Sequence, residues 1–227
     1  MTTSSTTTSS AATSSTTLPV GLVAAYGFDE PSGATVIDAS GRGNGGTIQT
    51  ATRTTDGRYG GALVFNGTSG WVTVNDAASL DLTTGMTIEA WVNPTSVAGW
   101  RQIAAKETTG GVTYWLYAGG GGGEPATGVF VGGQERALDG PSGLPLITWT
   151  HVAGTYDGAM QRLFVNGMQV GSRAQTGGAA VSASPLRIGG NGVWGEFFAG
   201  RIDEVRIYNR ALSQAEIASD MNRAITP

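Results

Sequence analysis

Short runs of alternating apolar and polar residues fill most of this chain. Residues 22–28 place Leu22, Ala24, Tyr26 and Phe28 on one parity, which predicts a half-buried strand. Further extended segments are predicted at residues 47–49, 62–65, 71–74, 80–82, 87–93, 101–106, 113–117, 129–131, 186–188 and 198–208. No helical pattern separates these strands, so an all-β fold of two packed antiparallel sheets is expected.

The clearest unit is residues 149–172, with the sequence WTHVAGTYDGAMQRLFVNGMQVGS. Asp157-Gly158 and Asn166-Gly167 are tight-turn dipeptides, because Gly accepts a positive φ and Asp and Asn tolerate it. The segment therefore predicts a meander of three strands joined by two turns.

Other local pairings follow from the turns between neighbouring strands. Residues 62–65 and 71–74 flank Asn66-Gly67 and are predicted as a hairpin. Residues 101–106 and 113–117 are predicted as an antiparallel pair, and residues 137–145, with two prolines and two glycines, as a loop. Ser213 followed by Glu216 is a capping box that begins a short helix near the end of the chain.

Five segments carry a family resemblance. They are the central meander, MTIEAWVNP (residues 86–94), FAGRIDEVRIYNRALSQAEI (residues 198–217), and VAAYGFDE with VIDASGRGNGGT near the start. Together they resemble the laminin G-like jelly rolls of the concanavalin A-like lectin/glucanase superfamily, over residues 21–221. The resemblance implies a two-sheet antiparallel jelly-roll sandwich with a short C-terminal helix. It says less about activity, because one fold hosts many functions.

Composition divides the chain into two parts. Residues 1–19 are almost entirely Ser and Thr, so they cannot bury enough apolar surface to order themselves. Two interpretations of this segment stay open, a glycosylated linker to other modules of a larger chain and a tail without a role. Residues 20–227 form the expected sandwich domain, and 37 glycines agree with its many turns.

Charge and cysteine content exclude several classes of function. The chain has no cysteine, which excludes disulfides, thiol catalysis and Cys-ligated zinc. The net charge of −4 offers no basic footprint for nucleic acid. No apolar run is long enough for a membrane span, and no signal peptide is visible. With the resemblance, we expect an extracellular or cell-surface location.

Catalytic motifs are absent, and no catalytic residue is assigned. Glycosidases of this superfamily place paired carboxylates on one face of a strand, because one carboxyl donates a proton and the other attacks or activates water. Asp203 and Glu204 are adjacent, so a regular strand would point them to opposite faces, and Glu89 is alone on its strand. The single histidine, His151, is interpreted as a structural hydrogen-bonding residue.

The loop at residues 38–46 contains Asp38 and Asn44 among glycines. Such residues suit both an ordinary turn and an oxygen-ligand site for Ca²⁺. The resemblance implies a structural calcium ion between an early loop and an aspartate of the closing strand. The matching residues are Asp38, Asn44 and Asp203, with Asp29 as a further candidate.

Sugar sites combine exposed aromatic rings with polar side chains, because sugars have apolar ring faces and polar rims. Residues in or beside predicted loops supply both kinds, although core packing of the aromatic residues is the alternative. The candidates are Trp100, Arg101, Trp115, Tyr117, Asn191 and Trp194.

These observations favour a non-catalytic carbohydrate-binding or adhesion module that recognises a polysaccharide or glycan. One alternative is a self-assembling structural subunit of a surface or filament, which would use exposed strand edges. A second alternative is a polysaccharide-degrading enzyme with an unrecognised motif.

Overall fold

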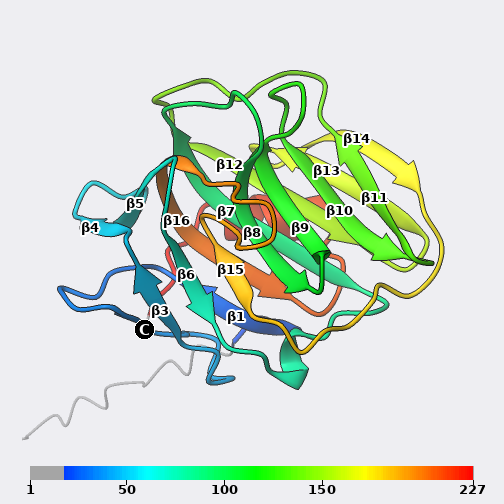
Figure 1. The fold of residues 1–227 in the computed structure, drawn as a ribbon, viewed down its shortest axis with the longest axis horizontal. Helices are drawn as coiled ribbons and strands as arrows, with labels where there is room; N and C mark the ends of the chain where they lie inside the picture. Colours follow the sequence, from blue (N-terminus) through cyan, green and yellow to red (C-terminus); the bar gives the residue numbers. More distant parts are fainter. Residues whose placement is uncertain (1–17, 227) are drawn as a thin grey trace, which may run out of the picture.

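The computed structural model describes residues 18–226, and within them sixteen strands form two antiparallel sheets that pack face to face (Figure 1). Sheet A has the order β14 (Met168–Ala174), β13 (Met160–Val165), β12 (Thr150–Tyr156), β7 (Met86–Pro94), β16 (Ala199–Tyr208), β5 (Ala62–Asn66) and β4 (Thr52–Thr54), and β1 (Leu22–Tyr26) pairs with β16. Sheet B has the order β11 (Gln134–Asp139), β10 (Ala126–Val131), β9 (Gly111–Gly119), β8 (Arg101–Thr108), β15 (Leu186–Ile188), β6 (Trp71–Val74), β3 (Gly46–Gln49) and β2 (Thr35–Val36).

The main core lies between the two sheets. Along β7, Ile88, Ala90 and Val92 enter it, and along β9 Tyr114 and Leu116 do the same. Residues between them point outward, as the period of two along a strand requires. The all-β, two-sheet sandwich expected from the sequence is therefore confirmed.

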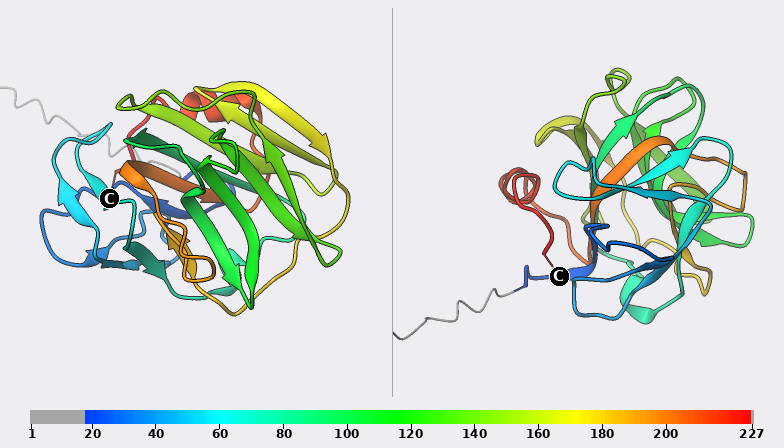
Figure 2. Two further views of the ribbon diagram at one scale, coloured as in Figure 1. Left: turned by 45° about the horizontal axis from the view of Figure 1, so that its top comes forward. Right: turned by 90° about the vertical axis from the view of Figure 1, so that its left-hand side faces the viewer.

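The short helix α1 (Gln214–Asp220) covers the outer face of sheet A (Figure 2). Ile217 packs there with Phe164 and Tyr208 in a second apolar cluster. The predicted capping box is confirmed, because the Ser213 side chain accepts from the Glu216 amide and the Glu216 side chain accepts from the Ser213 amide. The helix thus begins where the sequence places its first free amides.

The predicted meander is confirmed as β12, β13 and β14, which are hydrogen-bonded in that order. Its middle pairs include Val152 with Val165 and Ala153 with Phe164. The predicted pairing of residues 101–106 with 113–117 is also confirmed as β8 with β9. Local turn chemistry was sufficient in both cases, because the paired strands follow each other in the chain.

Three local predictions were wrong. Residues 62–65 and 71–74 do not form a hairpin, because β5 joins sheet A and β6 joins sheet B. Part of the predicted loop at 137–145 belongs to β11, a largely polar edge strand without an alternating apolar pattern. No strand is present at 80–82, because Leu80 ends a 3₁₀ turn at Ala78–Leu80 and the next two residues lie outside any strand.

The expectation that Asp203 and Glu204 point to opposite faces was also wrong. Ile202 and Val205 both enter the core, and a register shift separates Asp203 from Arg206. Glu204 has a φ of 54°, as expected at a bulge. Both carboxylates therefore point away from the core, and they hydrogen-bond to segments that cover sheet A.

Most of the Ser/Thr-rich segment at residues 1–19 lies outside the described residues. Its last two residues, Leu18 and Pro19, are described, and Leu18 is exposed. Among residues 18–226, no helix is long and apolar enough to cross a membrane.

Candidate functional site

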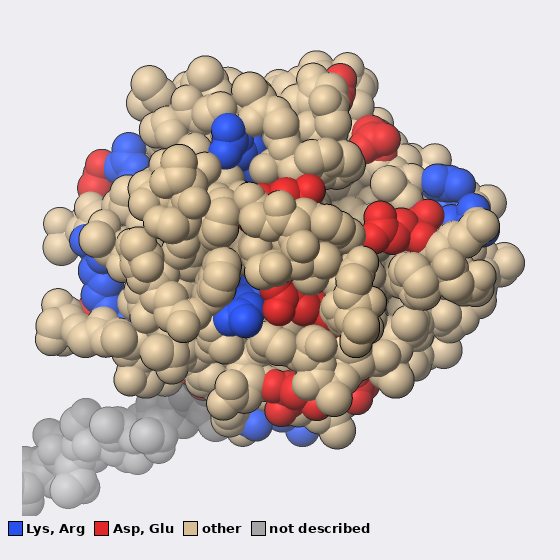
Figure 3. All heavy atoms as spheres, viewed as in Figure 1, with Lys and Arg blue, Asp and Glu red and all other residues tan. Residues whose placement is uncertain are grey.

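An aromatic pocket lies on the outer face of sheet B, the face seen in Figure 3. Its cavity measures about 330 Å³. Strands β9 and β11, the residue before β8 and the loop at residues 189–198 contribute its walls. The lining residues are Trp100, Val112, Trp115, Tyr117, Glu135, Ala137, Trp194 and Glu196.

The floor of the aromatic pocket is the indole of Trp115. Trp115 pairs with Gly128 on the neighbouring strand β10. A Cβ atom at Gly128 would lie 2.1 Å from Cζ2 of Trp115 and 2.6 Å from the carbonyl oxygen of Arg136. Only glycine leaves room for the indole to lie across the strand at this point. Trp115 is consequently 3% exposed although it lies outside the main core.

Two tryptophans form the rim of the pocket. Trp100 is 43% exposed and Trp194 is 45% exposed, in contrast to the buried floor. The Trp100 ring meets the Tyr117 ring edge to face, with centroids 5.5 Å apart. The Trp194 amide donates to Oδ1 of Asn191 at 2.8 Å, which fixes the turn that carries the indole. The rim therefore exposes two indole rings whose positions are fixed by neighbouring contacts.

A polar network lies behind the floor. The Tyr117 hydroxyl donates to Oε2 of Glu196 at 2.6 Å, and Nδ2 of Asn191 donates to the same oxygen at 2.9 Å. Asn191 also donates to Oε1 of Gln102 at 2.7 Å. Asn191 and Gln102 are fully buried, so the network sets the position of Glu196 before any ligand arrives.

Further contacts hold the loop at residues 189–198 against sheet B. The rings of Trp71 and Phe197 stack with centroids 5.8 Å apart. The Gly192 amide donates to Oε1 of Glu107 at 2.7 Å, and Gly190 pairs with Phe197 in a β-bridge. Because contacts anchor the loop at both ends, the position of Trp194 is largely preformed.

The electrostatics of the pocket are acidic. Burial raises the pKa of Glu135, and the nearby Glu196 carboxylate raises it further. Burial also raises the pKa of Tyr117, with a second contribution from its hydrogen bond to Glu196. Tyr117 is therefore a neutral donor at physiological pH.

The structure gathers five of the six residues predicted for sugar binding around this pocket. Trp100, Trp115, Tyr117 and Trp194 line it, and Asn191 lies behind it. Arg101 is turned away, because its Nη1 donates to the carbonyl oxygens of Gly67 and Phe197.

The sequence prediction missed several contributors to the pocket. Glu135 and Ala137 lie on an edge strand that was expected to be partly loop, and no motif marks Glu196. Gln102 and Gly128 hold the wall and the floor, and no sequence motif marks either residue. Gly128 stands out only in the structure, where the pairing of β9 with β10 places it opposite Trp115.

Two of the residues predicted for calcium organise the early loop. Asp38 accepts from the amides of Ala25, Ser40 and Asn44, each at 2.9 Å, and from the Ser40 hydroxyl. Nδ2 of Asn44 donates to the carbonyl oxygen of Val23 at 2.7 Å. These hydrogen bonds occupy both carboxylate oxygens of Asp38 without a metal.

The other two predicted calcium residues meet a different segment. Asp203 accepts from the amides of Arg58 and Tyr59, and Asp29 accepts from the amide of Gly61. Within residues 18–226 no three His, Cys, Asp or Glu side chains gather as a metal-binding group. The four residues do not form one ligand set in this structure, and calcium binding stays a prediction.

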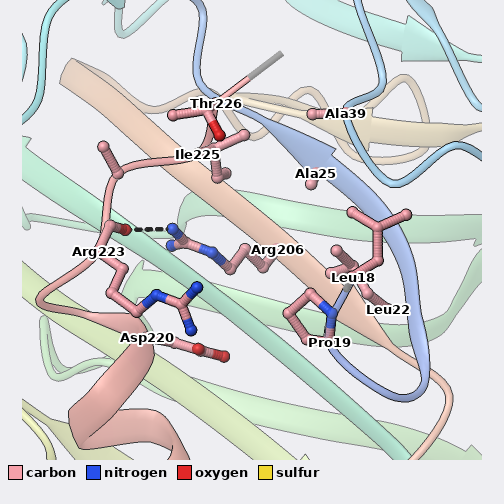
Figure 4. Close-up of a pocket in the computed structure, with 11 residues that line it drawn as sticks. Leu18, Pro19, Leu22, Ala25, Ala39, Arg206, Asp220, Arg223, Ile225 and Thr226 are labelled. Carbon is pink, nitrogen blue, oxygen red and sulfur yellow. Dashed lines mark hydrogen bonds between the residues drawn. The ribbon is translucent and has the colours of Figure 1, made fainter. Parts of the chain in front are cut away.

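A second hollow, of about 190 Å³, lies on the outer face of sheet A between the N-terminal and C-terminal segments (Figure 4). The Arg206 guanidinium reaches across it to the carbonyl oxygen of Arg223 and also pairs with Glu204 at 2.8 Å. The Tyr208 hydroxyl donates to Asp220. These polar groups hydrogen-bond to one another, so they hold the two terminal segments against sheet A and leave few groups for a ligand.

Glu89 and His151 lie buried on the same face of sheet A. Their Nε2–Oε2 distance is 3.8 Å, and neither side chain has a hydrogen-bond partner among the described residues. Burial raises the pKa of Glu89 to about 8 and lowers the pKa of His151 to about 3. Both are therefore uncharged near neutral pH, and the pair is not an ion pair. The structural interpretation of His151 fits its burial, but a hydrogen-bonding role does not.

Comparisons with solved structures agree with this architecture. Domain 4 of AbnA, an extracellular arabinanase from Geobacillus stearothermophilus solved with arabinotriose, is 24% identical with a TM-score of 0.71, covering 88% of this chain and 97% of that chain. The binding domain of Paraclostridial Mosquitocidal Protein 1 is 18% identical with a TM-score of 0.69, covering 89% of this chain and 52% of that one. At these identities the likeness shows the fold.

Sequence comparison supplies the family. Pappalysin-1 of Mus musculus is 36% identical over 78 residues, which are 32% of this chain and 5% of that protein. The chain thus spans a small part of this curated relative. The laminin G-like sequence model described as the concanavalin A-like lectin/glucanases superfamily matches residues 66–218, about two thirds of the chain. The chain therefore belongs to the concanavalin A-like lectin/glucanases superfamily.

Proposed function

We propose that this domain is a non-catalytic carbohydrate-binding module of a secreted or surface protein, and that it binds glycans in the aromatic pocket of sheet B. One observation carries the proposal: two half-exposed indoles, Trp100 and Trp194, flank a preformed hollow that ends in hydrogen-bonding groups. Indoles stack on the apolar faces of sugar rings, and the Glu196 carboxylate accepts from hydroxyls at their rims.

Relatives support a glycan as the ligand. The arabinanase domain was solved in complex with arabinotriose. A structure of botulinum neurotoxin type C is 10% identical with a TM-score of 0.66, and cell entry of that toxin depends on interaction with two ganglioside molecules. The arabinanase domain is matched over 97% of its length, so its complex places a sugar on a domain of this fold. The toxin chain is matched over 51% of its length. The aromatic pocket gives this chain a suitable surface for such a ligand.

The test is retention on a panel of soluble glycans and insoluble polysaccharides, with Trp100→Ala and Trp194→Ala beside the unchanged protein. Each variant is expected to weaken binding by about 1–2 kcal/mol, since stacking is lost from a partly exposed site. Trp149→Ala is the matched control, because Trp149 is a half-buried indole outside the pocket. Retention that is unchanged in both pocket variants would contradict the proposal.

A glycosidase is the second candidate, because Glu135 and Glu196 both line the pocket and Glu135 has a raised pKa. Glycoside hydrolysis uses one carboxyl of this kind as the acid and a second as the base or nucleophile. Release of reducing sugar from any polysaccharide of the panel, lost in Glu135→Gln, would replace the binding role with this one.

A further inference from the structure

The aromatic pocket combines aromatic faces with acidic groups, and no Lys, Arg or His is among its described lining residues. The tryptophan rim, the Trp115 floor and Tyr117 enclose it, and Glu135 and Glu196 are its charged residues. Asp139 lies two residues beyond Ala137 on the same face of β11, opposite Ala126, and is a third acidic group just outside the lining residues. Figure 3 shows acidic side chains, with basic ones beside them, at the centre and right of this face.

No neighbouring arginine in the described part of the chain forms an ion pair with Glu135 or Glu196. Arg101 is bound to the carbonyl oxygens of Gly67 and Phe197. Arg136 alternates with Glu135 along β11 and so faces the other side of the strand. Arg173 reaches β11 from sheet A, but it donates to the backbone carbonyl of Ala137 at the edge of the sheet.

The two lining carboxylates are not equivalent. Oε2 of Glu196 is occupied by Tyr117 and Asn191, whereas no described residue donates to Oε1. Glu135 forms no hydrogen bond or ion pair with a described side chain. Burial raises the pKa of Glu135, and repulsion from the Glu196 carboxylate raises it further. A cation between them would relieve this repulsion and would also lie near aromatic faces, which attract organic cations.

We propose that the aromatic pocket recognises a protonated amino sugar, and that it prefers a glycan bearing an ammonium group to a neutral or an acidic one. This inference rests on the proposed glycan-binding function and names its ligand class. The sugar ring would stack on the tryptophan rim while its ammonium group meets Glu135 and Glu196. A uronic or sialic acid would bring a third carboxylate into an already acidic pocket.

The experiment compares tetramers of β-1,4-linked glucosamine, glucose and glucuronic acid by titration calorimetry, at mildly acid pH and physiological ionic strength. The first two share backbone and linkage, and at carbon 2 one carries an ammonium group and the other a hydroxyl. We expect the glucosamine tetramer to bind about tenfold tighter than the glucose tetramer, from two partly exposed ion pairs and a cation–π contact. The glucuronic acid tetramer should bind weakest.

The Glu135→Gln variant tests whether the preference arises in this pocket. It should reduce the preference for glucosamine over glucose about threefold. Asp56→Asn is the matched control, because it removes one exposed carboxylate near sheet A and should leave the preference intact.

The outcomes separate this inference from the proposed function. Equal affinities for the glucosamine and glucose tetramers, both lost in Trp100→Ala and Trp194→Ala, would overturn the amino-sugar inference and leave the glycan-binding function standing. Absence of binding to all three tetramers would overturn the inference, and the wider glycan panel would then decide the proposed function. Glucosamine binding that is insensitive to Glu135→Gln and to both tryptophan variants would overturn the inference, since it would arise from the acidic surface at large. If free choline occupied the pocket at a lower concentration than the glucosamine tetramer does, the pocket would recognise an organic cation without the sugar. That result would overturn the assignment of an amino sugar as the ligand.

Discussion

Glu89→Gln is expected to stabilise the protein, and increasingly so as the pH rises. Glu89 lies fully buried on β7 with both oxygens lacking a hydrogen-bond partner among the described residues. Burial raises its pKa from 4.5 to about 8, with the Arg206 charge acting in the opposite direction. The folded protein therefore keeps a proton on Glu89 at pH values where the unfolded chain has lost it.

The sign and the size follow from this difference in pKa. Between pH 4.5 and about 8 the folded state binds more protons than the unfolded state, so the free energy of unfolding falls as the pH rises. At about 1.36 kcal/mol for each pH unit, the whole interval corresponds to about 5 kcal/mol. Glutamine cannot ionise and has nearly the same shape, so it removes this loss. Below pH 4.5 the two proteins should differ by about 1 kcal/mol or less.

The assay is denaturant unfolding of both proteins from pH 4 to pH 9, with the difference between their free energies of unfolding plotted against pH. His151 titrates in the opposite direction, because its lowered pKa costs stability as the pH falls below 6.5. It is present in both proteins, so its contribution cancels in the difference. A difference that stays flat between pH 4.5 and 8, or that favours the wild type at high pH, would refute the reasoning.

Two further predictions concern the pocket and the metal. Gly128→Ala should cost roughly 1–3 kcal/mol of stability and should weaken glycan binding, because the new Cβ displaces Trp115 from the floor. Gly178→Ala is the control, because a Cβ there meets nothing within 4 Å. Equal melting temperatures and affinities for the two variants would contradict the prediction. Calcium and EDTA should give the same glycan affinity by titration calorimetry, because Asp38 and Asp203 bind backbone amides outside the pocket; loss of binding in EDTA would contradict this. A calcium-dependent rise in the melting temperature alone would support the predicted structural ion without linking it to the pocket.

Several parts of the fold follow from local sequence. The two-residue turn at Asn166-Gly167 and the short turn that begins at Asp157-Gly158 fix the pairing of the strands on either side, because short connections leave little freedom in register. The capping box at Ser213 and Glu216 fixes the start of the helix in the same way. In each case the interacting groups lie within a few residues of one another, so the chain itself brings them together.

The sheet to which a strand belongs is not a local property. The segments at 62–65 and 71–74 alternate as a hairpin would, yet one joins sheet A and the other joins sheet B. The bulge beside Glu204 likewise depends on what packs on each side of β16. An alternating pattern predicts that one face of a strand is buried, but it does not predict which sheet the strand joins.

The aromatic pocket is mainly a tertiary property. The sequence identified Trp100 and Trp194 as candidates because loop aromatics are available to sugars. It did not identify Glu135 or Glu196 as residues of the site. Only the pairing of β8 to β11, with the loop at 189–198 folded across them, brings these side chains to one hollow. Sequence by itself determined most of the strands, the turns of the central meander and the stock of aromatic residues, because these depend on neighbours in the chain. The tertiary structure decided the pocket and its charge, because the residues that make it lie up to about one hundred positions apart and meet only when the sheets form.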